Sequence, residues 1–185
     1  MEAHLAGDHQ RAAELIRQAD CDAVRGWVEP LMGSVKQFPE RELLVGYRAL
    51  AEAPPKLPKA QRTLPRMPNR ASEQRIIARD GYHCVFCNIP VVSSAARKRL
   101  THLYPTEAYW GDRCHAALWC MWLQFDHVLP HGRGGTSEDQ NMVITCSGCN
   151  YGRMAFTLEE VGLADPRSVA RIQSDWDGLN RLLAA

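Results

Sequence analysis

The chain has 185 residues, 45% of them hydrophobic, and its 22 Lys and Arg nearly balance its 21 Asp and Glu. It contains no run of about 18 apolar residues, which excludes a membrane-spanning helix, and its polar first residues do not resemble a secretory signal. The sequence therefore predicts a soluble cytoplasmic protein whose core is large enough to fold without disulfides.

The net charge of +1 hides a basic middle third. Residues 1–53 carry nine acids and six bases, and residues 104–185 carry ten acids and six bases. Residues 54–103 carry ten bases and two acids, a difference of +8. Local charge of this kind can neutralise phosphates, although a solvated linker and helix face would look the same by composition.

The first 53 residues are predicted to be helical, with one helix over residues 8–27 and a second over residues 40–53. Apolar residues recur along both stretches at steps of mostly three and four, the pattern of a helix with one buried face. No catalytic group of residues is found here. This N-terminal region, residues 1–53, is therefore expected to serve docking, target recognition or formation of a homodimer.

A basic, proline-rich linker is predicted over residues 54–70, because its five prolines disfavour both helix and sheet. A short helix over residues 71–80 should follow it. That helix is expected to end at Gly81, since glycine readily terminates helices.

Further helices are predicted in the second half of the chain. Residues 94–124 are expected to form a helical insertion that Pro105 interrupts. Short helices are predicted over residues 157–162 and 175–183, the second of them within a C-terminal tail over residues 164–185.

Four of the seven cysteines form two CxxC pairs. Two such pairs can present four thiolates to one tetrahedral Zn²⁺, and a reducing compartment favours metal ligation over disulfides. The 58 residues between the pairs imply that a substantial segment is inserted between them. The sequence therefore predicts a structural zinc site, with four metal-free buried or redox cysteines as the alternative. Its ligands would be Cys84, Cys87, Cys146 and Cys149.

The remaining cysteines are Cys21, Cys114 and Cys120. A second metal site made of Cys114, His115 and Cys120 is a weaker interpretation, because only three ligands lie close together and Cys120 is embedded in an apolar run. Buried free thiols are the favoured interpretation.

Between the two cysteine pairs lie an Asp-His pair and an asparagine, and a second asparagine directly follows the last cysteine. Their order along the chain, Asp126-His127, Asn141 and then Asn150, resembles that of the HNH endonuclease family, the ββα-metal or His-Me finger nucleases, and specifically their four-cysteine branch. The resemblance covers residues 72–155, under half of the chain. It implies an α+β fold in which a small ββα-metal core with a four-cysteine zinc knot is surrounded by N-terminal, inserted and C-terminal helices, with the nuclease domain over residues 71–163.

The residue types suit phosphodiester hydrolysis. Asp126 offers a hard anionic oxygen and Asn150 a neutral carbonyl oxygen to one Mg²⁺ or Mn²⁺. His127, next to Asp126 in an extended run, should point to the opposite side and act as the general base. By resemblance, Asn141 hydrogen-bonds the loop backbone so that the His127 ring stays oriented. The alternative is a zinc-stapled fold that uses these residues only at turns and helix caps.

Basic residues near this site are the expected phosphate contacts. Arg133 lies in a glycine-rich loop, and Arg153 lies on the helix predicted after the second cysteine pair. His131 is expected to be a surface histidine. The linker could follow a DNA backbone as an extended arm, through Lys56, Lys59, Arg62, Arg66 and Arg70.

The sequence thus predicts a metal-dependent endonuclease that acts on DNA, with RNA left open as a substrate. Two rivals remain. One is a non-catalytic, zinc-stabilised nucleic-acid-binding module, and the other is an adaptor that works through its N-terminal helices. The insertion before Asp126 is longer than the simplest family layout has, so the sequence leaves the DNA target undefined.

Overall fold

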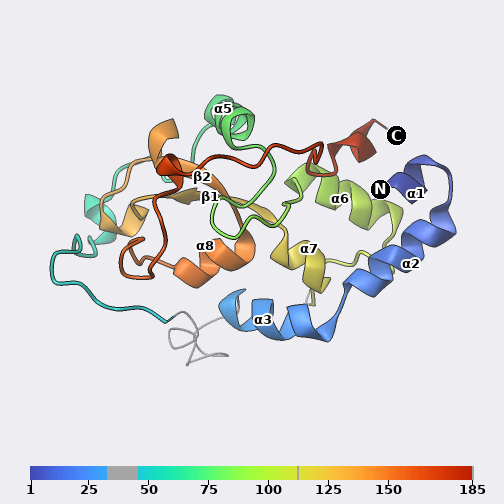
Figure 1. Cartoon of the computed structure of the whole chain (residues 1–185), viewed down its shortest axis with the longest axis horizontal. Helices are drawn as coiled ribbons and strands as arrows, with labels where there is room; N and C mark the ends of the chain where they lie inside the picture. Colours follow the sequence, from blue (N-terminus) through green and yellow to red (C-terminus); the bar gives the residue numbers. More distant parts are fainter. Residues whose placement is uncertain (33–45, 112, 185) are drawn as a thin grey trace.

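The structure is a computed structural model that describes residues 1–32, 46–111 and 113–184. It combines helices with a small two-stranded sheet, an α+β arrangement (Figure 1). No helix in these ranges is long and apolar enough to cross a membrane. In chain order the α-helices and strands are α1 (Glu2–Leu5), α2 (His9–Ala19), α3 (Asp22–Met32), α5 (Arg70–Asp80), α6 (Ser94–Leu103), α7 (Ala116–Cys120), β1 (Leu123–His127), β2 (Met142–Cys146) and α8 (Ser147–Arg153).

The sheet is a simple hairpin that positions the residues of the site. Strands β1 and β2 pair antiparallel, in a register that opposes Leu123 to Cys146 and His127 to Met142. Helix α8 follows β2 without an intervening loop. Because side chains alternate along a strand, Asp126 meets α8 while Phe125 packs into the apolar core with Ile76 of α5.

The N-terminal helices pack against the rest of the chain. Helices α1 and α2 join an apolar cluster with α6, α7 and the C-terminal 3-10 turn Asn180–Leu183 (Figure 1). The predicted helix over residues 8–27 is in fact two helices, α2 and α3, which is a correction. The break has a physical cause, because the Asp20 carboxylate between them accepts from the Ala116 backbone at 2.7 Å and pairs with Arg25 at 2.5 Å.

Two other helix predictions need correction. Residues 40–45 of the predicted second helix lie outside the described residues, and residues 46–53 are not helical. Tyr47 stacks on Phe156 with ring centroids 4.1 Å apart, so this stretch is used for packing on a distant loop. Beyond α8 the described chain has only 3-10 turns, over Pro166–Ser168 and Asn180–Leu183, in place of the two short helices.

The predictions around the insertion fare better. Helix α5 covers the stretch expected to be helical, and Gly81 ends it with a φ of 70°. Helices α6 and α7 make up the helical part of the insertion. The insertion prediction runs too far at its end, because Leu123 and Gln124 belong to β1.

Helix α3 crosses α8 at a close approach that depends on glycine. A Cβ added at Gly148 would lie 2.3 Å from a ring carbon of Trp27. We expect Gly148→Ala to lower the free energy of unfolding by ~1 to 2 kcal/mol, because the indole must move out of its contact. Urea unfolding followed by circular dichroism measures this.

Gly26→Ala is the matched control. Gly26 lies inside α3, and a Cβ there meets no atom within 4 Å. This variant should be neutral or more stable by ~0.5 to 1 kcal/mol, since alanine favours helix. Equal effects of the two substitutions would contradict the packing of Trp27 on Gly148.

Candidate metal centre and adjoining pocket

The four paired cysteines come together in space. The Sγ atoms of Cys84, Cys87, Cys146 and Cys149 all lie within 4.8 Å of one another, and those of Cys87 and Cys146 are 3.7 Å apart. Four sulfurs at about 2.3 Å from one tetrahedral Zn²⁺ are separated by about 3.8 Å. The cluster therefore fits zinc, and the predicted ligand set forms a possible zinc-binding site.

The backbone holds both cysteine pairs in compact turns. In the first pair, the Cys84 amide donates to the Ile89 carbonyl at 2.9 Å, and Asn88 turns the chain with a φ of 64°. In the second pair, Cys146 caps α8, and its sulfur accepts from the Cys149 amide at 3.3 Å. The second pair thus joins β2 to α8, so a bound zinc would fix the sheet, the helix and the first turn together.

The other three cysteines are free thiols, but only Cys120 is buried as expected; Cys114 is half-buried and Cys21 is exposed. Burial raises the pKa of Cys120 to about 11, which leaves it protonated. His115 is also occupied, because its Nε2 lies 2.8 Å from the Ile16 carbonyl and its Nδ1 accepts from Leu118. Among the described residues, the paired cysteines are the only group of three or more His, Cys, Asp or Glu residues placed to share a metal.

Asp126 is a buried carboxylate on β1 that lines a pocket. Its Oδ2 accepts from Nε and Nη2 of Arg153 at 3.1 and 2.6 Å, and its Oδ1 accepts from the His127 amide at 2.8 Å. Burial raises the pKa of Asp126, and the Arg153 guanidinium opposes that rise. The two oxygens of a carboxylate offer about four acceptor positions, so a position on Oδ1 remains.

His127 lies on the other side of β1, where its ring is 5.5 Å from that of His131. Burial lowers the pKa of His127 to about 4, and the neighbouring His131, Arg66 and Arg153 act in the same direction. The imidazole is therefore neutral near pH 7, the form that can accept a proton.

The contacts of the Ser137 hydroxyl favour one tautomer of the His127 ring. Ser137 Oγ lies 3.1 Å from Nε2 of His127, and 2.9 and 2.7 Å from the carbonyl oxygens of Pro65 and Arg66. Carbonyl oxygens only accept, so the single hydroxyl proton goes to one of them and Oγ accepts from Nε2–H. This arrangement favours the tautomer in which Nδ1 is the unprotonated nitrogen.

Asn150 stands on α8 beside Gln124 of β1. Its Nδ2 donates to Gln124 Oε1 at 3.4 Å, while Gln124 itself donates to the Leu123 carbonyl at 3.0 Å. This pair orients the amide with Nδ2 towards β1. The Asn150 carbonyl oxygen, Oδ1, is then not the atom that binds Gln124, and it is a neutral oxygen that can act as a metal ligand.

Asn141 orders the loop between the strands. Its Oδ1 accepts from the Leu129 amide at 2.9 Å, and its Nδ2 donates to the carbonyls of Leu129 and Thr136 at 3.2 and 2.8 Å. The loop passes so close that a Cβ at Gly135 would lie 1.8 Å from the Leu129 carbonyl oxygen. Asn141 thus contacts backbone only, and its effect on the His127 ring stays a prediction.

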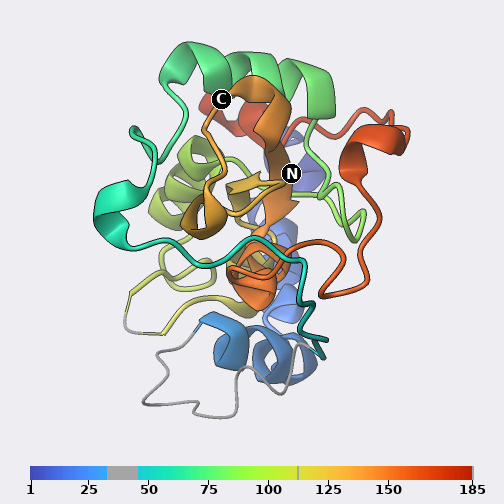
Figure 2. The same cartoon turned by 90° about the vertical axis from the view of Figure 1, so that its left-hand side faces the viewer.

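A pocket of about 470 Å³ brings several of these groups together. Asp126, His127 and Asn150 line it, and so do the three bases Lys56, Arg62 and Arg66. The segment over residues 54–69 runs across the loop at this side of the molecule (Figure 2). The segment that the sequence predicted to be a linker therefore forms one wall of this pocket.

Hydrogen bonds fix this wall in place. The Leu57 amide donates to the Gly132 carbonyl at 2.8 Å, and His131 Nε2 lies 2.6 Å from the Thr63 carbonyl. His131 is consequently buried, which corrects the expectation of a surface histidine. Lys59 and Arg70 are exposed and do not line the pocket.

Arg133 and Arg153 occupy structural positions, which corrects their expected role as phosphate contacts. The Arg133 side chain is 8% exposed, donates to the Ala155 carbonyl at 2.6 Å and pairs with Glu160 at 2.9 Å. Arg153 is 3% exposed and binds Asp126 and the His127 carbonyl. The sequence could not show these partners, because each lies more than 20 residues away from its arginine.

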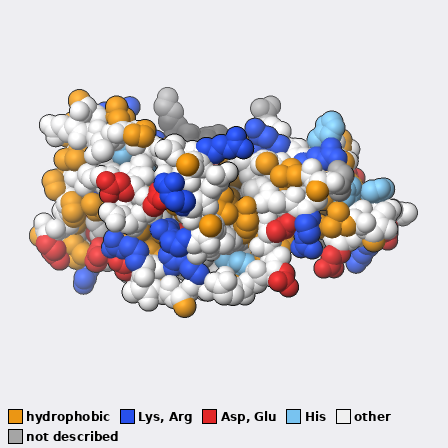
Figure 3. Space-filling model, turned by 90° about the horizontal axis from the view of Figure 1, so that it is seen from above, with side chains coloured by type: hydrophobic (Ala, Val, Ile, Leu, Met, Phe, Trp, Pro, Cys, Tyr) orange, Lys and Arg blue, Asp and Glu red, His pale blue; other side chains and the backbone are white. Residues whose placement is uncertain are grey.

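The other bases of the middle third divide by environment. Lys and Arg side chains gather near the middle of the face that carries α5, with acidic side chains beside them (Figure 3). Arg75 pairs with Asp139 at 2.5 Å, and Arg79 with Asp80 at 2.8 Å. Arg97 covers the Trp110 ring at 3.7 Å. Part of the basic charge is therefore neutralised locally.

Sequence reasoning missed two polar anchors. Ser137 gave no signal, because the residues it contacts are 10, 71 and 72 positions away. Asp80 is 1% exposed and accepts from Arg79, from Arg171 at 2.8 Å and from the Ile144 amide at 3.1 Å. It thereby connects α5, β2 and the C-terminal segment.

No known protein family, curated protein or solved structure matches this chain. Its function must accordingly be argued from the geometry of the site.

Proposed function

We propose that the chain is a metal-dependent endonuclease of the HNH type, which hydrolyses DNA phosphodiester bonds in the pocket beside His127. The observation that carries this proposal is the shared lining of that pocket. The buried carboxylate of Asp126, the neutral imidazole of His127 and the amide of Asn150 line it. Three bases line it as well, namely Lys56, Arg62 and Arg66.

The donor set suits a hard divalent cation. The remaining acceptor position on Asp126 and the Oδ1 atom of Asn150 are both oxygens, as Mg²⁺ and Mn²⁺ prefer. Such an ion, when bound, supplies positive charge that stabilises the phosphate oxygens while the ester bond breaks. Arg153 would keep the Asp126 carboxylate oriented towards it.

His127 supplies the proton transfer in this proposal. Its Nδ1 takes a proton from water as the water oxygen bonds to phosphorus and the bond to the 3′ oxygen breaks. The 3′ oxygen would take a proton from solvent, so the products would be a 5′-phosphate and a 3′-hydroxyl, as the resemblance implies. Lys56, Arg62 and Arg66 would hold the phosphates of the same strand.

One site of this kind cuts one strand. A double-strand break would need two nicks or a homodimer, for which the outer faces of the N-terminal helices are the candidate surface. RNA is the other substrate that the same chemistry could serve.

One observation favours a second candidate, a non-catalytic nucleic-acid-binding module. The salt bridge from Arg153 occupies Oδ2 of Asp126, and a cation must share the carboxylate with it. This candidate keeps the basic pocket and the zinc site but has no hydrolytic step.

Nicking of supercoiled plasmid separates the two candidates. The zinc-loaded full chain is incubated with the plasmid in Mg²⁺, in Mn²⁺ and without added divalent ion, and the substrate panel includes methylated and single-stranded DNA. The nuclease proposal expects nicking only with added ion. Salt-sensitive DNA binding without nicking of any substrate would favour the module.

Ser137→Ala tests whether the Ser137 hydroxyl positions the His127 ring. We expect nicking about tenfold slower, because a hydrogen bond of about 1.5 kcal/mol that holds the ring is lost. Ser137→Thr keeps the hydroxyl and should restore most of the rate. Ser168→Ala removes an exposed hydroxyl that likewise donates to a carbonyl, and it should have no effect. Equal rates for Ser137→Ala and the wild type would contradict the positioning of the His127 ring by Ser137.

A further inference from the structure

The segment that walls the pocket presents a large apolar side chain to solvent. Leu64 is 82% exposed, the highest value among the exposed large hydrophobic side chains of the described chain. Met67, three residues on, is 46% exposed. Isolated exposed leucines are common on proteins, so exposure alone implies nothing.

The backbone around Leu64 is held on both sides. Before it, the Thr63 carbonyl lies 2.6 Å from Nε2 of His131. After it, the Pro65 carbonyl accepts from the Ser137 hydroxyl at 2.9 Å. Both anchoring side chains come from the loop that follows β1, so Leu64 is fixed relative to the imidazole of His127.

The surroundings of Leu64 suit a polyanion. Arg62 and Arg66 flank it at two residues on either side, and both line the pocket that contains Asp126. Met67 lines that pocket and also the neighbouring one of about 400 Å³, to which Leu64 belongs. Along the chain, an apolar residue thus lies between two basic residues that line the pocket of the proposed catalytic groups.

We propose that Leu64, supported by Met67, is a wedge that enters between neighbouring base pairs of duplex DNA bound at this pocket. The inference rests on the proposed function and names its substrate class, double-stranded DNA at a weakly stacked or mismatched step. Proteins that insert leucine or methionine between base steps offset an unstacking cost of a few kcal/mol with added contacts. Arg62 and Arg66 would hold the phosphates on either side of the opened step.

Binding to matched duplexes tests the wedge without any cleavage. The zinc-loaded full chain, with no Mg²⁺ or Mn²⁺ added, is titrated into duplexes of one sequence, either fully paired or with a central mismatch flanked by 2-aminopurine. We expect about tenfold tighter binding to the mismatched duplex, because part of the unstacking cost is already met. We also expect 2-aminopurine fluorescence to rise as its stacking is lost.

Leu64→Ala should remove both the preference and the fluorescence rise while it keeps salt-sensitive binding to the paired duplex. Leu183→Ala is the matched control, because Leu183 is 48% exposed and belongs to the 3-10 turn Asn180–Leu183, which lies at the other end of the molecule from residues 54–69 (Figure 1). It should behave as the wild type does.

Two outcomes would overturn the proposal, and they differ in meaning. Equal affinity of the wild type for paired and mismatched duplexes, or an unchanged preference in Leu64→Ala, removes the wedge and leaves the nuclease proposal intact. Absence of binding to every DNA tested would remove the wedge together with the proposed function.

Discussion

Cys87→Ser is expected to leave the protein unfolded under conditions in which the wild type is folded. Cys87 contributes one of the four sulfurs that connect the first turn with β2 and α8. Structural zinc contributes on the order of 10 kcal/mol to folding, which is comparable to the whole stability of a domain. Circular dichroism and the zinc content of the purified protein measure the effect, and a strong chelator should unfold the wild type similarly.

Cys21→Ser is the matched control for this substitution. Cys21 is an exposed free thiol, as Cys87 is exposed, but it lies outside the cluster. It should change neither the zinc content nor the unfolding transition. A Cys87→Ser protein that is as stable as Cys21→Ser would show that the four sulfurs do not hold a structural metal.

His127→Ala is expected to slow plasmid nicking by ~10²- to 10⁴-fold, the usual contribution of a general base. His127 is the proposed base, and its Nε2 lies beside the Ser137 hydroxyl. His131 also lines the pocket, but its Nε2 lies beside the Thr63 carbonyl instead. DNA affinity should change little, because the proposal assigns the phosphate contacts to the lysine and arginines of the pocket and not to His127. Initial nicking rates with Mg²⁺, together with binding measured without it, separate the two effects.

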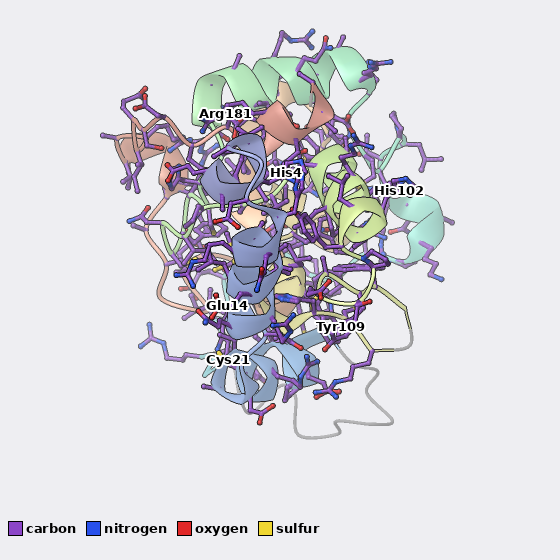
Figure 4. The ribbon with its side chains drawn as sticks, turned by 90° about the vertical axis from the view of Figure 1, so that its right-hand side faces the viewer. His4, Glu14, Cys21, His102, Tyr109 and Arg181 are labelled. Carbon is purple, nitrogen blue, oxygen red and sulfur yellow. The ribbon has the colours of Figure 1, made fainter. Side chains whose placement is uncertain are left out.

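His102→Ala provides the comparison for a histidine outside the site. His102 is exposed on α6 (Figure 4) and does not line the pocket. Its nicking rate should equal that of the wild type. If His127→Ala also nicks at the wild-type rate, the enzyme proposal loses its base, and the binding module becomes the better account.

Local patterns in the sequence predicted the parts of the site that depend on neighbouring residues. The CxxC spacing predicted that the cysteines would form a cluster, and this is confirmed. The alternation along β1 placed Asp126 and His127 on different sides, as their contacts with Arg153 and Ser137 show. The end of α5 at Gly81 was likewise predictable, since it depends on one residue type.

The remaining features depend on partners that lie far away in the chain. Arg153 looked like a phosphate contact because the carboxylate it neutralises lies 27 positions earlier. The proline-rich segment looked like a free linker, because only the folded loop offers the Gly132 carbonyl and the His131 ring that bind it. Tertiary hydrogen bonds of this kind leave no periodic signal in a sequence.

The most direct test of the account is the location of a Mn²⁺ ion in crystals of the zinc-loaded protein. Mn²⁺ can be located by its anomalous scattering, and this test requires no knowledge of the DNA target. The account predicts one ion bound by both Asp126 and Asn150, in the pocket that His127 lines, and its loss in Asn150→Ala. Mn²⁺ absent from this pocket at saturating concentration, with Arg153 still bound to Asp126, would contradict the proposed catalytic centre.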